Sequence, residues 1–427
     1  MQLRLLDYPG CGGILDAVLL PKKHPTRCST CSYSFEMPIH NRFQHQTYSC
    51  ERPQAPYEII APSPPLEWNA ARRNATFEAL AGVLAKRKIQ VVYLVHGTFT
   101  GTDALGFIRE FERWKPDIGK KLRDAQKMLI DKITGEAGNY SESYAKSFQD
   151  ALNHGSSNHG SSSIPTVKLF HWTSENLHLA RANAAVRLLD ELLEDTYHEQ
   201  RRYLMWGHSH AGNVFALLTN LIGSDVRTLR KFFKIGDAWR RFPLLGHLDP
   251  PVWKRVRERV LENPEILKRI ELDIVTFGTP IRYGWETSSY RSLSHFVYHR
   301  PQASKTEYLA PFPEGLSDVL EARYGDCVQQ LGIAGTNFTP FLFAWRSWIV
   351  EERFRRFLQR GISRLNTLDR LRIGQRVANE GKAFLVDYDV DGTTTAQQLF
   401  GHAIYTRTEW LPFHMQKVAT ELAEQES

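Results

Sequence analysis

The chain has 427 residues, of which 42% are hydrophobic and 24% are charged, and its formal net charge is +7. This is an ordinary globular composition, and a chain of this length buries a large core. A charge of +7 spread over 427 residues does not by itself indicate a nucleic-acid-binding protein. No apolar run reaches the roughly 18 residues that a membrane span needs. The first residues also lack a basic segment followed by an apolar one, so we expect a cytoplasmic protein without a secretory signal.

Four of the five cysteines lie in the first 50 residues. Cys28 and Cys31 have the C-x2-C spacing with which two thiolates grip one zinc ion. There is no second close pair, so the remaining ligands would be Cys11 and Cys50, or a histidine in place of either: His24, His40 or His45. We therefore expect a structural zinc site in this segment, with reduced cysteines or disulfides as the alternatives.

Residues 1–65 are rich in proline, cysteine and turn residues, and they end in a proline-rich stretch. This composition indicates a small module or arm followed by a stiff connector. The remaining residues, 66–427, are predicted to form one domain, because large α/β domains often use about 250 residues as a single unit.

Short apolar runs alternate with helical patterns after this connector. The first helix is predicted over 69–87, and a buried strand over 89–97 then stops at a glycine. Further strands are predicted over 166–172, 203–207, 272–278, 294–299 and 383–389, and helices between them include 175–197 and 211–223. Strands that alternate with amphipathic helices predict a mostly parallel sheet with helices on both faces, which is an α/β fold.

Residues 203–214, YLMWGHSHAGNV, place a serine between two histidines where a strand gives way to a helix. In open parallel sheets, ligands bind beyond the carboxyl ends of the strands. At such a sharp turn the residues two before and two after the serine come close together, so both must be small, as Gly207 and Ala211 are. The helix that follows points its N-terminal N–H groups at any anion formed near Ser209.

This stretch resembles the nucleophile elbow, G-x-S-x-G, of the α/β-hydrolase superfamily, with Ala211 in place of the last glycine. The earlier stretch VVYLVHGTFTG resembles the strand and H-G turn that supply an oxyanion-hole N–H in these enzymes. The stretch IVTFGTPIRYG is similar to the turn after the nucleophile helix in lipase-like members. The resemblance covers about residues 88–415 in scattered motifs, leaves out the first 65 residues and assigns no subfamily.

The resemblance implies a Ser-His-Asp triad with Ser209 as its nucleophile. In this superfamily the histidine lies on a loop after the final strand, which implies His402 as the base. His414 lies in a predicted terminal helix, where we expect it to pack or to be solvated. The side chains of the two histidines that flank the serine are expected to point away from it. The oxyanion hole would use backbone amides at these positions: Thr98 or Phe99, and His210.

The acid of the triad should follow the penultimate strand. Gly325-Asp326-Cys327-Val328 resembles the Asp-containing loop of lipase-like hydrolases, which implies Asp326 as the acid. Otherwise Asp326 would be a turn aspartate that caps the following residues 327–332, and the acid would be Asp389 or Asp391, which come shortly before His402 in the chain, while Asp387 lies within a strand. Trp172 and Asn176 follow another strand and would either line the pocket or pack in the core.

Two insertions interrupt the α/β alternation, at about 103–165 and 225–270. The first contains HGSSNHGSSS, a low-complexity stretch that is predicted to be a loop. The second holds basic, aromatic helices, which form either a solvated face or a cap over the active site that contacts an anionic or lipid surface. In a cap, five aromatic side chains would face the substrate: Phe232, Phe233, Trp239, Phe242 and Trp253.

The predicted function is therefore a serine hydrolase of carboxylic esters, of the lipase or esterase kind, that works through an acyl-enzyme and needs no cofactor. Its partners would be a small-molecule or lipid ester substrate and an anionic membrane surface. Amidases, peptidases and thioesterases use the same triad and stay open as alternatives. A non-catalytic binding protein on the same scaffold is the alternative of a different class, but such a protein would have no reason to keep Ser209, Asp326 and His402.

Overall fold

The structure is a computed structural model of the chain. It describes residues 26–27, 34–35, 43, 55–97, 139–156, 164–240, 250–303, 306–311, 313, 318, 321–333, 345–358, 374–388 and 401–425. Within the first 54 residues it shows a short antiparallel pair of strands, β1 (Thr26–Arg27) and β2 (Ser34–Phe35).

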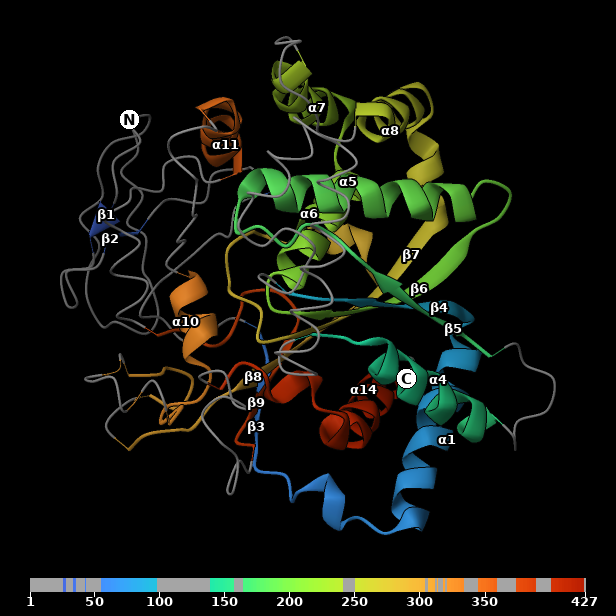
Figure 1. The fold of residues 1–427 in the computed structure, drawn as a ribbon, viewed down its shortest axis with the longest axis vertical. Coiled ribbons are helices and arrows are strands. Elements are labelled where there is room, and N and C mark those ends of the chain that lie inside the picture. The colour runs from blue at the N-terminus through green and yellow to red at the C-terminus, as the bar shows by residue number, and fades with distance from the viewer. Residues whose placement is uncertain are drawn as a thin grey trace, which may run out of the picture.

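The described part of the chain is built around a seven-stranded sheet in the order β3-β9-β8-β7-β6-β4-β5, and all of its strands are parallel (Figure 1). The strands are β3 (Tyr57–Ile60), β4 (Ile89–Val95), β5 (Thr166–Phe170), β6 (Arg201–His208), β7 (Ile270–Phe277), β8 (Ser292–Tyr298) and β9 (Lys382–Val386). Strands β4 to β9 confirm the predicted ones, and the parallel sheet confirms the α/β class.

Strand β3 differs from the stiff connector that the proline-rich sequence predicts before residue 65. Tyr57–Ile60 pairs with β9 at the edge of the sheet, where the Ala383 N–H donates to the Pro56 carbonyl. A proline is tolerated beside an edge strand because it needs to donate no ladder hydrogen bond. The short strand is hidden in the sequence because prolines surround it.

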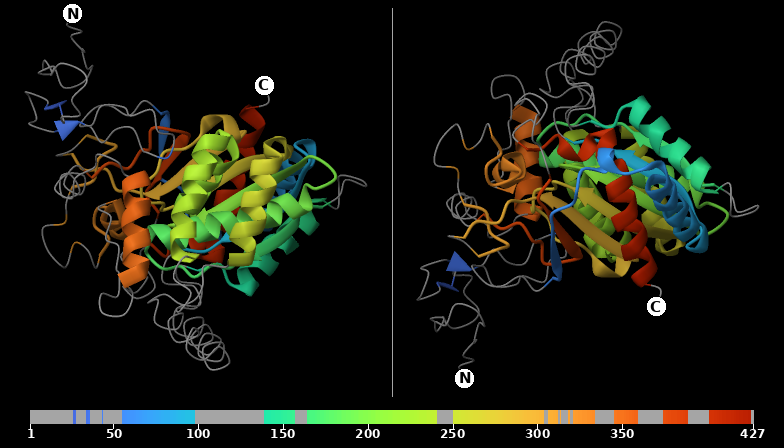
Figure 2. Two further views of the ribbon diagram at one scale, coloured as in Figure 1. Left: turned by 90° about the horizontal axis from the view of Figure 1, so that it is seen from above. Right: turned by 90° about the horizontal axis from the view of Figure 1, so that it is seen from below.

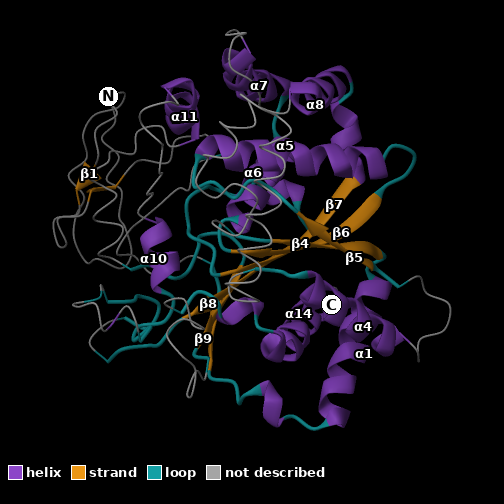
Figure 3. Cartoon of the chain, viewed as in Figure 1, coloured by secondary structure: helices purple, strands orange, loops and turns teal. Residues whose placement is uncertain are grey.

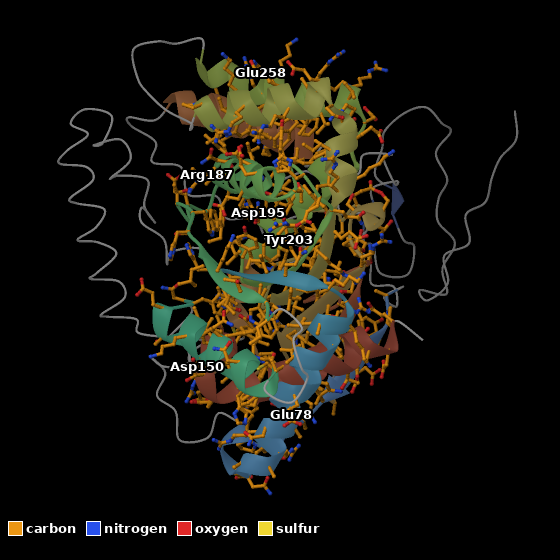
Figure 4. All side chains as sticks on the ribbon, turned by 90° about the vertical axis from the view of Figure 1, so that its right-hand side faces the viewer. Glu78, Asp150, Arg187, Asp195, Tyr203 and Glu258 are labelled. Atoms are coloured by element: carbon orange, nitrogen blue, oxygen red, sulfur yellow. The ribbon has the colours of Figure 1, made fainter. Side chains whose placement is uncertain are left out.

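Helices cover both faces of the sheet (Figure 1, Figure 3). One face carries α1 (Ala70–Lys86), α4 (Glu142–Ser156) and α14 (Leu411–Glu424), and the other carries α5 (His178–Asp195) and α6 (Ala211–Gly223). In the edge-on view of Figure 4, Tyr203 lies at the sheet, Asp150 on one side of it, and Glu258 beyond the other. Each face has its own large buried apolar cluster, and a smaller third cluster surrounds Val297 and Leu385 of β8 and β9.

Three helices form a further layer outside α5: α7 (Val226–Arg240), α8 (Pro250–Glu262) and α11 (Trp345–Leu358) (Figure 1, Figure 2). The ring of Phe232 stacks on Trp253 at 5.6 Å, and Phe233 packs edge-on against the same indole. The Trp253 Nε1 donates to Asn183 on α5 at 2.8 Å. The prediction that these three aromatic rings face a substrate is therefore wrong, because they join α7 and α8 to α5 in the core. The side chains of Trp239 and Phe242 lie outside the described residues.

Local sequence explains where α1 begins. The Asn69 side chain accepts from the Arg72 N–H at 2.8 Å, which caps the first turn of α1.

The remaining short elements are α10 (Cys327–Ile333) and the 3-10 turns Pro65–Glu67, Pro264–Arg269, Thr287–Ser289, Ile404–Thr406 and Thr408–Trp410. None of the helices in the described ranges combines the length and the apolar character that crossing a membrane requires.

Candidate active site

Ser209 lies in a strained turn between β6 and α6. Its φ is 55°, in the left-handed region that costs a residue with a side chain about 1–3 kcal/mol unless its surroundings hold it. They do so through three hydrogen bonds. The Ser209 N–H donates to Phe277 O at 2.7 Å, and the Ser209 carbonyl accepts from Thr279 Oγ1 at 2.7 Å and from the Gly212 N–H at 3.2 Å. The turn is thus held by the end of β7 as well as by its own helix.

The residues around the turn must be small because neighbouring atoms lie too close for a larger side chain. A Cβ on Gly207 would lie 2.4 Å from Cε2 of Phe215 and 3.1 Å from the Cβ of Ala211, so the two positions next to the turn do approach each other as predicted. A Cβ on Gly97 would lie 2.6 Å from the Ser209 Cβ and 3.2 Å from its Oγ. Because Gly97 follows β4, this contact brings the end of β4 against the serine hydroxyl.

The serine lies where the strand order of the sheet reverses. From β4 the chain runs to β5 on one side and then returns to β6 on the other side of β4. In open α/β sheets the ligand-binding crevice lies outside the carboxyl ends of the strands at such a switch point. The first N–H groups of α6, which have no partner within the helix, point into the same region. Thr98 and Phe99 lie outside the described residues, so their predicted role stays a prediction.

His402 and Asp326 meet in a buried pair, although 76 residues separate them in the chain. The distance between His402 Nδ1 and Asp326 Oδ2 is 2.7 Å, and the two residues are 8% and 0% exposed. Nε2 of His402 is buried and has no hydrogen-bond partner among the described residues. It is therefore not hydrogen-bonded to the Ser209 hydroxyl. The structure therefore joins two members of the predicted triad and leaves the serine without its hydrogen bond to the histidine.

His208 holds the loop of His402 beside the serine. Its Nε2 donates to the His402 carbonyl at 2.9 Å, and the two imidazole rings are 4.5 Å apart. Its Nδ1, like the Ser209 Oγ, would lie 3.2 Å from a Cβ on Gly97. This polar contact fits the prediction that His208 does not act on the serine directly.

Both oxygens of the Asp326 carboxylate accept hydrogen bonds. Oδ2 accepts from the Tyr405 hydroxyl at 2.9 Å in addition to His402, and Oδ1 accepts from the Gln329 N–H at 2.8 Å. The buried Arg376 guanidinium donates to the Asp326 carbonyl at 2.6 Å and to Tyr324 O at 3.1 Å, which holds the loop backbone. Sequence reasoning missed Tyr405 and Arg376, because no motif spacing links either of them to Asp326.

The His210 side chain lies on the far side of the serine turn among buried polar groups. Burial, followed by the nearby Arg181 and Arg282 guanidinium groups, holds the pKa of His210 well below its usual value, so the ring is neutral. Its Nδ1 lies 3.2 Å from the Asn213 Nδ2. The ring of His210 therefore packs among polar groups, as expected, and the oxyanion role of its backbone amide stays a prediction.

Trp172 and Asn176 are both packing residues. The Trp172 ring stacks on His96 and donates through Nε1 to the His96 carbonyl at 2.9 Å, which holds the strand end that precedes Gly97. The Asn176 Oδ1 accepts from Arg181 at 2.9 Å. Of the two interpretations offered for Trp172, core packing is thus the one that the contacts support.

The rival base and acids lie elsewhere. His414 is buried in α14, its Nε2 lies 2.8 Å from the Tyr388 hydroxyl, and burial lowers its pKa to about 3. Asp387 pairs with Arg300 at 2.9 Å. Asp389 and Asp391 lie outside the described residues. Among the acids that are described, Asp326 is therefore the one that contacts His402.

The predicted zinc ligands Cys11, Cys28, Cys31 and Cys50 lie outside the described residues, so zinc binding there stays a prediction. Within the described ranges, no group of three or more His, Cys, Asp or Glu side chains is arranged to hold a metal ion. A cavity of about 460 Å³ lies at the opposite, amino-terminal end of β7 and β8, next to Ile270 and Arg291. It lacks the buried acid-base pair, so we place the candidate site at Ser209.

Comparisons of the chain with family models, with curated proteins and with solved structures found no match. The chemistry assigned to this site therefore depends on its own geometry: a serine in a strained turn at the switch point of a parallel sheet, and a buried His-Asp pair beside it.

Proposed function

We propose that the protein is a serine hydrolase of carboxylic esters with an α/β-hydrolase fold, in which Ser209 is the nucleophile, His402 the base and Asp326 the acid. The observation that carries this proposal is the buried His402–Asp326 pair, 2.7 Å between Nδ1 and Oδ2, next to a serine with a φ of 55°. The order serine, acid, histidine along the chain, and the position of each after a strand of the sheet, also support it.

The reaction follows from the roles of the two ring nitrogens. Asp326 accepts a hydrogen bond from the Nδ1–H of His402, which leaves Nε2 as the basic nitrogen. As Ser209 Oγ attacks the ester carbonyl, its proton passes to Nε2, and the same proton then goes to the departing alcohol. Water releases the acid from the acyl-enzyme by the same route. Because Nε2 lacks a partner in this structure, the Ser209–His402 hydrogen bond must form when substrate binds.

Negative charge on the carbonyl oxygen would be stabilised by backbone N–H groups. The start of α6 supplies the amide of His210, and the turn after Gly97 supplies that of Thr98 or Phe99. Each such donor is worth about 3 kcal/mol of transition-state stabilisation. Because the His210 ring is neutral, it adds no charge of its own near these amides.

A fluorophosphonate probe tests the proposal, because it forms a covalent adduct only with an activated serine. We expect labelling of the wild-type protein at Ser209 and none in Ser209→Ala. Ser174→Ala is the matched control, since Ser174 is also buried and also left-handed, with a φ of 56°, but does not follow β6. Labelling that persists in Ser209→Ala would contradict the assignment. A wild-type protein that does not react would favour the non-catalytic alternative.

Matched oxygen ester, thioester and anilide substrates with the same acyl group would separate the hydrolase alternatives. We propose the ester as the preferred substrate, and a higher kcat/KM on the thioester or anilide would reassign the enzyme to the thioesterase or amidase class.

A further inference from the structure

Helix α7 carries a row of exposed cations without an ion-pair partner among the described residues. Arg227, Arg230, Lys231 and Lys234 are all exposed, and their spacing of three, four and seven residues places them on one face of the helix. Within the described ranges none of the four side chains makes an ion pair or a hydrogen bond. This α7 basic stripe extends over about 10 Å, which is seven residues of helical rise.

The adjacent helix α8 differs in that its cations are paired. Lys254 and Arg257 both lie within ion-pair distance of Glu258, and Arg255 and Arg259 bridge to acids on α5, namely Asp190 and Glu194. Asp225, which precedes the stripe, accepts from the Thr228 N–H at 2.7 Å and so caps the helix. Asp237 also lies in α7, and its side chain lies outside the described ones. Of these two adjacent helices, α7 is therefore the one whose exposed cations lack ion pairs among the described residues.

The apolar face of α7 is already in use inside the protein. Leu229, Phe232 and Phe233 are at most 1% exposed, and Phe232 packs against both Trp253 and Phe354. An interfacial helix that inserts into a bilayer must offer such residues to the acyl chains. Since α7 cannot, any membrane contact through this face is electrostatic and leaves the lipid chains undisturbed.

We propose that the α7 basic stripe binds the surface of an anionic lipid bilayer. Four unpaired cations on one convex helix face complement a layer of negatively charged headgroups. Sequence-tolerant binding of single-stranded nucleic acid would add aromatic side chains on which bases stack, and the described aromatics of α7 are buried. Binding to a duplex needs cations alone, so the experiment below includes one. The proposal is independent of the catalytic one, although a lipid ester substrate would give the surface an obvious use.

Co-sedimentation with vesicles of phosphatidylcholine, with and without phosphatidylserine, tests this surface. We expect binding only to the anionic vesicles, and loss of binding as salt shortens the Debye length from about 10 Å at 0.1 M to about 3 Å at 1 M. Each cation near an anionic surface contributes about a five-fold factor in affinity, so Arg230→Gln with Lys231→Gln should bind roughly 30-fold more weakly.

Lys254→Gln with Arg257→Gln is the matched control, because it removes the same number of cations from the adjacent helix α8, where both lie within ion-pair distance of Glu258. It should bind anionic vesicles like the wild type, and both double variants should hydrolyse a short soluble ester at the wild-type rate. Equal vesicle binding by the two double variants would overturn the proposal. A duplex oligonucleotide bound more tightly than the vesicles at the same salt would reassign the stripe to nucleic acid.

A second inference arises independently at Asp326. Tyr405 donates to the same carboxylate oxygen, Oδ2, that accepts from His402. The Tyr405 hydroxyl in turn accepts from the Tyr298 N–H at 2.7 Å, so its proton is directed at the carboxylate. We infer that Tyr405 is a positioning residue that fixes Asp326 and reduces the negative charge that the carboxylate presents to His402.

The titration of the His402 ring, followed by NMR, tests this role without relying on activity. In Tyr405→Phe the carboxylate keeps more of its charge for the imidazolium, so the titration should move to higher pH. If the proposed function holds, the low-pH limb of kcat/KM should move in the same direction. The other titratable groups around the pair stay in place in this variant: His208, His210, Arg376, Tyr388 and Cys327.

Tyr388→Phe is the control, because Tyr388 is equally buried and lies 2.8 Å from His414 instead of Asp326. Both tyrosine variants should lower Tm, since each leaves a buried polar group without its partner. Only Tyr405→Phe should move the His402 titration. If both variants lower Tm and neither moves the His402 titration, Tyr405 has a structural role alone and the inference is overturned.

Discussion

Replacement of Asp326 by asparagine should reduce kcat for ester hydrolysis by about 10⁴-fold while the protein stays folded. The Asp326 carboxylate accepts from His402 Nδ1 at 2.7 Å and is fully buried, so water cannot take its place. An amide that offers N–H to Nδ1 would favour the tautomer with its proton on Nε2. In that tautomer His402 cannot accept the Ser209 proton. Steady-state kinetics with a short acyl ester would measure the loss, and near-ultraviolet circular dichroism would check the packing.

Asp387→Asn provides the comparison for this variant. Asp387 lies at the end of β9 and pairs with Arg300 at 2.9 Å, and its side chain is 39% exposed. Surface ion pairs of this kind contribute at most about 1 kcal/mol, so both kcat and stability should stay near wild type. If Asp326→Asn retained wild-type activity, the acid would have to be sought at Asp389 or Asp391.

Replacement of Gly97 by alanine should reduce kcat/KM by at least about 100-fold. The added methyl would lie 2.6 Å from the Ser209 Cβ and 3.2 Å from its Oγ, so either the hydroxyl or the turn after β4 has to move. A displacement of about 1 Å in a reacting group, or the loss of one oxyanion donor, is enough for an effect of this size. The rate of fluorophosphonate labelling should fall in parallel, because the probe reacts with the same hydroxyl.

The control for this variant is Gly223→Ala at the far end of helix α6. There the methyl would lie 2.3 Å from Cγ of Glu286 and 2.4 Å from Oγ of Ser289, far from the candidate site. This substitution should lower Tm and leave the specific activity of the folded protein unchanged. The interpretation of Gly97 would be contradicted if Gly97→Ala affected only Tm, as Gly223→Ala is expected to do.

Local patterns in the sequence were sufficient for most of the α/β framework. The apolar runs that end at Gly97, Gly207 and Gly278 are strands, and the run 211–223 is the helix α6. These elements are predictable because each is buried along most of its length and so forms a continuous apolar run, and glycine marks the turn that ends each strand. The spacing around Ser209 was informative for the same reason, since the need for small neighbours arises within ten residues of chain.

Other parts of the molecule depend on contacts between distant segments. The aromatic residues of α7 and α8 have the composition of a lid, and the structure uses Phe232 and Trp253 to join an outer helix layer to α5. Strand β3 is too short, and too closely flanked by proline, for its own pattern to reveal it. In both cases the partner surface, α5 or β9, settles what the segment does.

The surroundings of the acid show the same division most clearly. Asp326 and His402 were picked out by motif and chain order, but only the fold brings them within 2.7 Å and adds Tyr405 to the same oxygen. Arg376 reaches the loop from 50 residues away. A hydrogen bond depends on the direction and distance of two side chains, and those are set by the packing of β8, β9 and the loops beyond them. Sequence patterns describe one segment at a time and carry no information about a hydrogen bond between two distant segments.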